Sequence, residues 1–234
     1  MAINVYGEKY KQYWNNGAHG MLMSTVHKLL EFSYLNVRSG KTNNIRILEI
    51  GGGAMPHLEW VRDRENIEEY MISDSASVLF DNKIINEFVS VHEYDKDVNL
   101  QKLSKNNYDR IIAAQVWGHV NEPEKMLLRW IDLLNKDGVL SISIPCDPGI
   151  LWRTGQKVAA RKFMKLYGVS FEEYDILMSR EHINPAQRLM KIINYYFDIK
   201  KVVYFPLLVP SINLNLFAII TVTKKNFISK RVEN

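Results

Sequence analysis

The sequence predicts an α/β domain built around a parallel sheet, and three consecutive features lead to that prediction. Residues 45–50 form a short apolar run with isoleucine at its first, third and last positions, which indicates a buried strand. Gly51, Gly52 and Gly53 follow directly, and a helical pattern begins near Pro56. Glycines between a strand and a helix permit a tight turn and leave room for a ligand beside bare backbone. A ligand site is therefore expected here, at the carboxyl end of the strand; a glycine turn without a ligand is the alternative.

The residues around this turn favour a nucleoside ligand. The dinucleotide fingerprint is excluded because the third position after Gly53 holds Pro56, and no Gly-Lys-Ser/Thr follows to cradle a phosphate. The sequence offers instead Glu49 inside the first strand and a second predicted strand, 70–74, that ends in Asp74. An acid about 20 residues beyond such a turn commonly binds ribose hydroxyls.

Together these residues resemble a known enzyme family. The run 48–53 is similar to the first motif of class I S-adenosylmethionine-dependent methyltransferases, and Asp74 is similar to the ribose-binding acid of that family. Residues 108–145 resemble its fourth strand, the helix that follows and its fifth strand. The resemblance implies a Rossmann-like, doubly wound sheet of about seven strands whose last strand is antiparallel, with S-adenosyl-L-methionine as the cofactor. One position departs from the pattern: Met55 stands where the family often has glycine, and a side chain there narrows the approach to the methionine end of the cofactor.

The resemblance implies cofactor contacts from several places along the chain. The first strand and its turn contribute Glu49 and Gly51–Gly53, and the second strand contributes Asp74. An acid just after the third strand holds the adenine amino group in the family, which makes Asp95 the candidate, because a carboxylate accepts hydrogen bonds from an amine. A solvated loop acid is the alternative. Gln115, at the end of the fourth strand, is placed beside the cofactor by the same resemblance.

Residues 1–44 are predicted to form an N-terminal helical cap. Tyr6, Tyr10 and Tyr13 are spaced by four and three positions, so a helix would place them on one face, and a further helix is predicted over 24–35. In the resembling family such a segment closes over the cofactor, which makes Tyr13 a candidate substrate contact. Packing of these tyrosines against the sheet is the alternative.

The segment 147–198 is predicted to be a helical insertion between the fifth and sixth strands, and in the resembling family this region shapes the acceptor pocket. Four cations recur at every fourth position and would form one basic stripe on a helix: Arg153, Lys157, Arg161 and Lys165. Like charges at this spacing cost a few tenths of a kcal/mol each, which an anionic partner would offset; a solvated face is the alternative. Arg153 and Arg180 are candidates for binding a phosphate or carboxylate, because a guanidinium group binds such anions through two parallel hydrogen bonds.

Three residues are candidates for catalysis. His182 could take a proton from an acceptor hydroxyl, since imidazole titrates near neutrality, and Glu181 could orient it. A contact network between a loop and a helix is the alternative for both. His119, after the fourth strand, is a second candidate base, for which a purely structural role is the preferred alternative. Asn184 precedes Pro185 and is predicted to cap the helix that follows.

Composition limits the remaining properties. A chain of 234 residues suits one domain, here divided into the cap, a cofactor-binding core (45–146), the insertion and a closing hairpin (199–225). A formal net charge of +4 permits an anionic substrate but does not indicate nucleic-acid binding, and no metal site is predicted. The single Cys146 excludes an internal disulfide. A cytoplasmic location is expected, because the sequence has no apolar run of membrane-spanning length and no signal-peptide core. A homodimer is left open.

The function expected from the resemblance is transfer of a methyl group to a small, anionic acceptor, with O-methylation of a sugar or sugar phosphate as the leading hypothesis. The block 146–184 is similar to methyltransferases that modify bacterial surface sugars or their phosphorylated precursors, which implies a place in polysaccharide biosynthesis. A sulfonium methyl is already activated, so the protein chiefly aligns acceptor, methyl and sulfur. Two alternatives are a methyltransferase for an amine, a lipid or RNA, and a non-catalytic partner subunit with the same fold.

Overall fold

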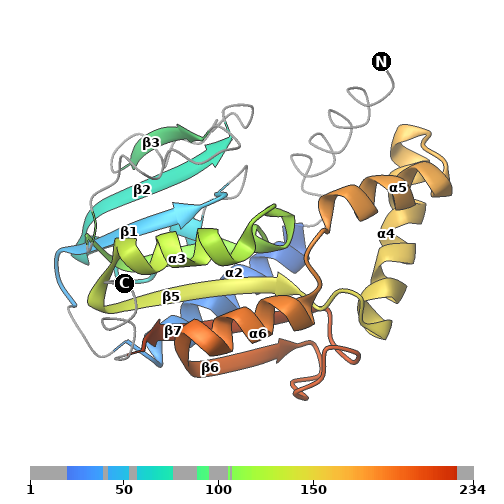
Figure 1. Ribbon diagram of the computed structural model, residues 1–234. Helices are drawn as coiled ribbons and strands as arrows, with labels where there is room; N and C mark the ends of the chain where they lie inside the picture. Colours follow the sequence, from blue (N-terminus) through green and yellow to red (C-terminus); the bar gives the residue numbers. More distant parts are fainter. Residues whose placement is uncertain are drawn as a thin grey trace.

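The computed structural model in Figure 1 is a mixed sheet with helices on both faces. It describes residues 20–38, 42–52, 57–75, 89–94, 105 and 107–225, with the backbone alone at 74–75 and 89–94. Its strands are β1 (Ile45–Ile50), β2 (Ile67–Ser75), β3 (Val89–Tyr94), β4 (Tyr108–Ala114), β5 (Leu134–Pro145), β6 (Phe197–Phe205) and β7 (Phe217–Lys224). Its α-helices are α2 (Gly20–Leu35), α3 (Pro123–Leu133), α4 (Ile150–Tyr167), α5 (Phe171–Glu181) and α6 (Ala186–Tyr196).

The order of the strands sets a topological switch point between β1 and β4, at the carboxyl ends of the strands. Within the described residues seven strands run in the order β3-β2-β1-β4-β5-β7-β6. Strands β1 to β5 are parallel, whereas β7 is antiparallel to both β5 and β6. The chain leaves β1 toward β2 and β3 and returns to β4 on the other side of β1, and doubly wound sheets bind ligands at such a switch point. The predicted sheet with an antiparallel last strand is confirmed.

Helices cover the two faces of the sheet unequally. Apolar residues of α3 and α6, among them Trp130 and Leu189, join the large core cluster formed with β4, β5 and β7. On the opposite face α2 contributes Val26 and Leu30 to a smaller cluster with Ala114 of β4. Figure 1 shows α3 and α6 on the near face and α2 behind the sheet. The larger cluster reaches the carboxyl ends of β4 and β5, where it includes Trp117 and Cys146.

The helices α4 and α5 form a hairpin beyond the carboxyl end of β5, as Figure 1 shows. Helix α4 ends at Gly168, whose φ of +66° is the left-handed conformation typical of a glycine after a helix. Helix α5 begins with a capping box between Ser170 and Glu173. The hairpin has its own small core, which includes Phe163 and Tyr174. The helical insertion between the fifth and sixth strands is therefore confirmed, and no described helix is long and apolar enough to cross a membrane.

The segment after the glycine turn differs from the prediction. Instead of an α-helix from Pro56, a position outside the described residues, the structure has two 3-10 turns, η1 (His57–Trp60) and η2 (Arg64–Asn66). Strand β2 begins at Ile67, three residues earlier than predicted, and the chain at His57 is tied back to β1 by the hydrogen bonds of its backbone N–H to Glu49. Half of the cap predicted over 1–44 lies outside the described residues, namely 1–19 and 39–41, and the helix predicted over 24–35 begins at Gly20.

Candidate active site

The glycine turn leaves bare backbone between strands β1, β2 and β4. Gly51 follows β1 with a φ of +70°, a left-handed conformation that residues with a side chain rarely adopt. A Cβ atom on Gly51 would lie 2.1 Å from Val116 Cγ2, and a Cβ atom on Gly52 would lie 2.8 Å from Ile72 Cγ2. Both positions require glycine for space, and Gly51 also requires it for its backbone conformation.

Glu49 holds the chain around this turn in place. Its carboxylate is buried and accepts hydrogen bonds from the backbone N–H of His57 at 2.8 and 2.9 Å. The Tyr70 hydroxyl donates to the same carboxylate at 2.5 Å. Burial raises the pKa of Tyr70 well above its ordinary value and the neighbouring Glu49 raises it further, so this hydroxyl remains a donor. These hydrogen bonds fix the position of the Glu49 carboxylate beside the turn.

Asp74 lies at the carboxyl end of β2, the strand beside the glycine turn. The residue before it, Ser73, accepts a backbone hydrogen bond from Gly51 at 2.7 Å, so the backbone of Asp74 stands one residue beyond the level of the turn. That position agrees with the ribose-binding role implied by the resemblance. Four further parts of the predicted site lie outside the described residues: the Asp74 side chain, Gly53, Met55 and Asp95.

Gln115 follows β4 on the other side of the switch point. It has a φ of +59°, and its backbone N–H and side-chain amide each lie 3.1 Å from Ser143 Oγ on β5. These contacts fix the start of the loop whose next residue, Val116, fills the space above Gly51. The structure thus brings the end of β4 next to the glycine turn, where Gln115 remains a candidate cofactor contact.

His119 and Glu181 contact each other. Nδ1 of His119 lies 2.7 Å from the backbone oxygen of Glu181 and 3.7 Å from its carboxylate. Because a carbonyl oxygen only accepts, this nitrogen carries the ring proton. Burial lowers the pKa of His119, although Glu181 opposes the shift, so the ring is neutral at physiological pH. The pair connects the loop after β4 to the end of α5, which is the structural role preferred for His119.

His182 lies beside Asp147, so Glu181 does not orient it as predicted. The distance from His182 Nδ1 to Asp147 Oδ2 is 3.9 Å, and this buried nitrogen has no hydrogen-bond partner among the described residues. The His182 ring also lies against His119 and Trp152, with centroid separations of 4.9 and 5.2 Å. Burial and the neighbouring His119 lower the pKa of His182 to about 3. Burial raises the pKa of Asp147 to about 6, although Arg153 opposes this shift.

Asn184 fixes the position of this cluster but does not cap α6. Pro185 is the N-cap residue of that helix, and no side chain caps it. The buried Asn184 amide instead donates to the Val120 backbone oxygen at 2.6 Å, and the Asn184 backbone N–H donates to Gly118 at 3.1 Å. The prediction of a cap is wrong because the side-chain oxygen of Asn184, which would have to accept a backbone N–H, accepts from the Arg188 guanidinium at 3.0 Å instead. Through its amide and backbone N–H, Asn184 holds the end of the insertion against the loop after β4.

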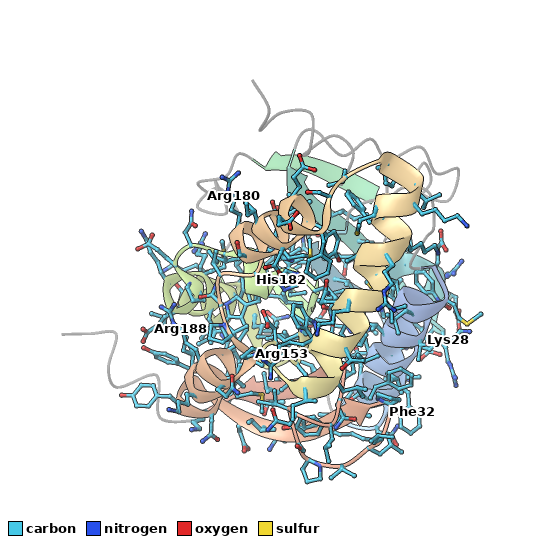
Figure 2. The ribbon with its side chains drawn as sticks, turned by 90° about the vertical axis from the view of Figure 1, so that its right-hand side faces the viewer. Lys28, Phe32, Arg153, Arg180, His182 and Arg188 are labelled. Carbon is cyan, nitrogen blue, oxygen red and sulfur yellow. The ribbon has the colours of Figure 1, made fainter. Side chains whose placement is uncertain are left out.

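Two arginines border the cluster from different helices. Arg153 lies in the first turn of α4, close enough to Asp147 for its charge to affect that carboxyl, and Arg180 lies in the last turn of α5. Both side chains are exposed, and in the view of Figure 2 His182 lies between them. Exposed guanidinium groups at this place can bind an anionic acceptor. Tyr13, the other predicted substrate contact, lies outside the described residues.

Sequence analysis missed a buried ionic network behind the glycine turn. Arg110 of β4 donates to Glu31 of α2 at 2.6 Å, and its guanidinium carbon lies 3.8 Å from the centre of the Tyr34 ring. His57 Nε2 lies 3.2 Å from the same Glu31 oxygen, while its Nδ1 lies 3.0 Å from Nδ1 of His27. All five side chains are buried. A neutral His57 that donates to Glu31 and accepts from His27 satisfies both contacts, so the network joins α2 to the residue that Glu49 holds.

This network should make the folded state less stable as the pH falls below 6.5. Burial lowers the pKa of His57 from 6.5 to about 4. Burial alone would raise the pKa of Glu31, but the His57 hydrogen bond and the Arg110 charge outweigh it and lower the pKa from 4.5 to about 2. In both cases the unfolded chain binds its proton at a higher pH than the folded chain, so stability is lost as the pH falls. Asp147 acts in the opposite sense. Because its pKa is higher in the folded chain, this residue makes the folded state less stable as the pH rises from 3.8 to about 6.

The measurement is the urea midpoint of unfolding as a function of pH. We expect the midpoint to fall from pH 7 to pH 4, because His57 and Glu31 together outweigh the single opposing Asp147. In the Glu31→Gln variant the urea midpoint should fall less between pH 7 and pH 4 than in the wild type, because the variant lacks this carboxylate. A midpoint that stays constant, or rises, over this interval would contradict the assigned protonation states.

Solved structures of low sequence identity share this fold. The plantazolicin methyltransferase BpumL in complex with SAH is similar with a TM-score of 0.61 and 14% identity, over 93% of this chain and 90% of that chain. The CurJ carbon methyltransferase has a TM-score of 0.58 and 19% identity, over 85% of this chain and 54% of that chain, so this chain spans about half its length. The [4+2]-cyclase SpnF has a TM-score of 0.56 and 14% identity, over 85% of this chain and 80% of that chain. No curated protein is a significant match.

The strand order and the glycine turn place this chain in the fold class of the S-adenosylmethionine-dependent methyltransferases, which confirms the resemblance seen in its sequence. Within that class, residues 34–148 match the family model described as Methionine biosynthesis protein MetW. The match covers just under half of the chain. It includes strands β1 to β5 and the glycine turn, and ends before α4 begins.

Proposed function

We propose that this chain transfers a methyl group from S-adenosylmethionine to an oxygen atom of a small, anionic acceptor of the sugar or sugar-phosphate type. The observation that carries the proposal is the position of two features at the carboxyl edge of one sheet. Bare backbone at Gly51 follows β1, and the His182–Asp147 pair lies where the chain leaves β5. Direct transfer requires the methyl donor and the acceptor hydroxyl to be bound next to each other, and two sites at the same edge of the sheet permit this.

The glycine turn suits an adenosyl sulfonium. Gly51 and Gly52 add no side chain of their own to the turn, where Val116 and Ile72 pack against them, and the Asp74 backbone stands at the adjacent strand end, where a carboxylate can take ribose hydroxyls. When bound, S-adenosylmethionine supplies an activated methyl group, so the protein needs chiefly to position the acceptor. Asp95 and Gln115 complete the proposed cofactor contacts.

His182 is the proposed general base. Its Nδ1 atom is buried and neutral at physiological pH, so it can accept a hydroxyl proton from the acceptor. The pKa of about 3 is low for a base, but an anion held by Arg153 and Arg180 would stabilise the protonated ring and raise this value. Asp147, at 3.9 Å, would stabilise the same protonated ring and replaces Glu181 as the positioning residue. His119 and Glu181 support the loop around it.

His182→Ala should lower turnover by about 10²–10⁴-fold with little change in S-adenosylmethionine affinity, because a general base contributes to the chemical step and not to cofactor binding. The measurements are methyl transfer from labelled cofactor and calorimetric titration of the same preparation. His119→Ala is the matched comparison. We expect a smaller loss of turnover in this variant, because the His119 ring is hydrogen-bonded to the Glu181 backbone in the wild type. Equal loss of turnover and cofactor affinity in His182→Ala would remove His182 from the role of base.

The acceptor is tested by a screen of nucleotide sugars, sugar phosphates and amines with the wild-type chain. We expect O-methylation of a phosphorylated sugar, which agrees with a place in polysaccharide biosynthesis, and no methylation of the amines. If Arg180→Ala loses transfer to anionic acceptors but not to uncharged ones, this result would support the contact assigned between Arg180 and the anion. Methylation confined to an amine would overturn the acceptor assignment and leave the cofactor assignment intact.

One observation favours a second candidate function. The similar structures include a [4+2]-cyclase, so this fold also occurs in a protein named for a reaction other than methyl transfer. A chain that binds S-adenosylmethionine without transferring its methyl group to any acceptor would fit that second function or a partner-subunit role. An RNA acceptor would be recognised by binding that falls steeply with salt.

A further inference from the structure

We propose that this protein docks onto an anionic phospholipid surface through an apolar corner beside the start of α4. The apolar corner consists of five large aliphatic side chains that are all exposed: Ile150 (60%), Leu207 (57%), Leu208 (68%), Val209 (44%) and Leu214 (46%). Four of them lie in the β6–β7 loop, which Figure 1 shows below the start of α4. The two parts are in contact, since Leu151 N–H donates to the Asn213 backbone oxygen at 2.9 Å.

The β6–β7 loop is organised from inside by a polar residue. Asn215 is completely buried, and its Oδ1 accepts the Leu207 N–H at 2.9 Å. Its amide group donates to the backbone oxygens of Val209 and Ser211, each at 2.8 Å. A loop that used its leucines for its own stability would bury them; here the amide is inside and the leucines face outward. Such an exposed apolar group marks a surface that contacts another apolar phase.

Leu208 supplies a second, independent observation. Its φ of +58° lies in the left-handed region, where a branched side chain is strained, yet the side chain is 68% exposed. Backbone strain of this kind is concentrated at functional positions. The Leu208 N–H donates to the Tyr204 backbone oxygen at 3.1 Å, so the strained residue closes a turn that presents its side chain to the outside.

The charge next to the apolar corner favours a lipid surface with negative head groups. Helix α4 contains no acidic residue and exposes five cations along its length: Arg153, Lys157, Arg161, Lys162 and Lys165. Figure 2 shows α4 on the near face with Arg153 toward its start. The other helix of the hairpin, α5, carries four acids: Glu172 and Glu173 lie in its first turn, Asp175 follows, and Glu181 is its last residue, beside His119. Apolar side chains beside a basic helix face are the combination that binds anionic membranes.

The orientation of the surface has a consequence for the proposed site. Asp147 lies three residues before Ile150, so docking through the apolar corner brings the His182–Asp147 pair near the bilayer surface. The docking proposal can be tested independently of methyl transfer, because the residues changed in its test, Leu207, Leu208, Lys157 and Arg161, lie outside the candidate catalytic and anion-binding groups. A second copy of the chain is a weaker partner for this surface, since its own α4 would present the same positive charge.

The test is flotation of the full chain with phosphatidylcholine vesicles that contain or lack phosphatidylglycerol. We expect binding to the phosphatidylglycerol vesicles, weakened by salt, and little binding to phosphatidylcholine alone. Leu207→Ser/Leu208→Ser and Lys157→Glu/Arg161→Glu should each lower binding by about tenfold or more. The matched controls change an exposed apolar residue of α6 (Tyr195→Ser) and an exposed lysine of α3 (Lys125→Glu), and should bind as the wild type does.

Three results would overturn the proposal. The first is the absence of flotation with phosphatidylglycerol vesicles. The second is unchanged flotation of both double variants, each with a circular dichroism spectrum like that of the wild type. The third is a homodimer in solution that Leu207→Ser/Leu208→Ser dissociates, with no vesicle binding by the wild type; this result would assign the apolar corner to a second copy. Because methyl transfer to a soluble acceptor is measured separately, failure of docking and failure of the proposed function are distinguishable.

Discussion

Gly51→Ala is expected to weaken S-adenosylmethionine binding by about 30- to 150-fold, which corresponds to about 2–3 kcal/mol. Two effects combine at this position. The backbone has a φ of +70°, which strains any residue with a side chain, and the new Cβ atom would lie 2.1 Å from Val116 Cγ2. Either the turn or the loop after β4 must move, and both lie at the switch point proposed for the cofactor. The measurement is calorimetric titration with S-adenosylmethionine, accompanied by thermal unfolding.

Variants of two other glycines and one double variant separate the effect of backbone strain from the effect of the clash with Val116. Gly168 has a φ of +66° with open space around it, so Gly168→Ala should cost about 1 kcal/mol of stability and leave cofactor binding unchanged. Gly20 has neither constraint and should tolerate alanine. Gly51→Ala/Val116→Ala relieves the clash and should recover part of the affinity. If Gly51→Ala bound the cofactor like the wild type, the glycine turn would not be the cofactor site.

Arg110→Leu should reduce the free energy of unfolding by about 3–5 kcal/mol. The substitution leaves the Glu31 carboxylate buried beside His57 without the cation that lies 2.6 Å from it. An uncompensated buried charge is far more costly than a lost surface pair. The measurement is urea unfolding at neutral pH, where the Glu31 carboxylate is ionised. Because the network also contacts the chain after the glycine turn through His57, cofactor affinity should fall as well.

The matched control for this prediction is Arg46→Leu on the neighbouring strand. Arg46 pairs with Glu69, but both side chains are partly exposed, so its loss should cost about 1 kcal/mol or less. The double variant Arg110→Leu/Glu31→Leu removes both charges and should recover much of the stability lost in the single variant. An Arg110→Leu chain as stable as Arg46→Leu would show that the buried network contributes little.

The sheet and the glycine turn could be predicted from the sequence because their signals are local. A short isoleucine-rich run followed by three glycines indicates a buried strand and a tight turn without knowledge of any partner. The closing hairpin predicted over 199–225 was likewise recognisable, and it corresponds to β6 and β7, joined by a loop from residue 206 to residue 216. The spacing of the apolar residues indicates whether a segment is a strand or a helix. The order of strands and helices along the chain then indicates the type of sheet.

The pairing of side chains in the site could not be predicted, because sequence neighbours are poor guides to contacts between segments. Glu181 and His182 are adjacent in the chain, yet they face His119 and Asp147 respectively. Asp147 did carry a usable signal, since it lies two residues after the fifth strand, at the carboxyl edge of the sheet. The Glu31–Arg110 network carried none, because its members come from separate segments that only the folded sheet brings together.

The distribution of charge explains why composition alone was a weak guide to partners. The net charge of +4 is small, but α4 has five cations and no acid, and it lies beside an exposed apolar loop. Neither the charge nor the loop is unusual by itself. Their contact through the α4 start is a property of the tertiary structure, and it is this contact that indicates an anionic lipid surface.

The central claim is that the glycine turn binds an adenosyl sulfonium, and calorimetric titration of the wild-type chain with S-adenosylmethionine and S-adenosylhomocysteine tests it most directly. The account predicts one saturable binding site per chain for each compound, lost or greatly weakened in Gly51→Ala and retained in Gly168→Ala. No binding of either compound to a folded wild-type chain would contradict the account, and the methyltransferase assignment would fall with it.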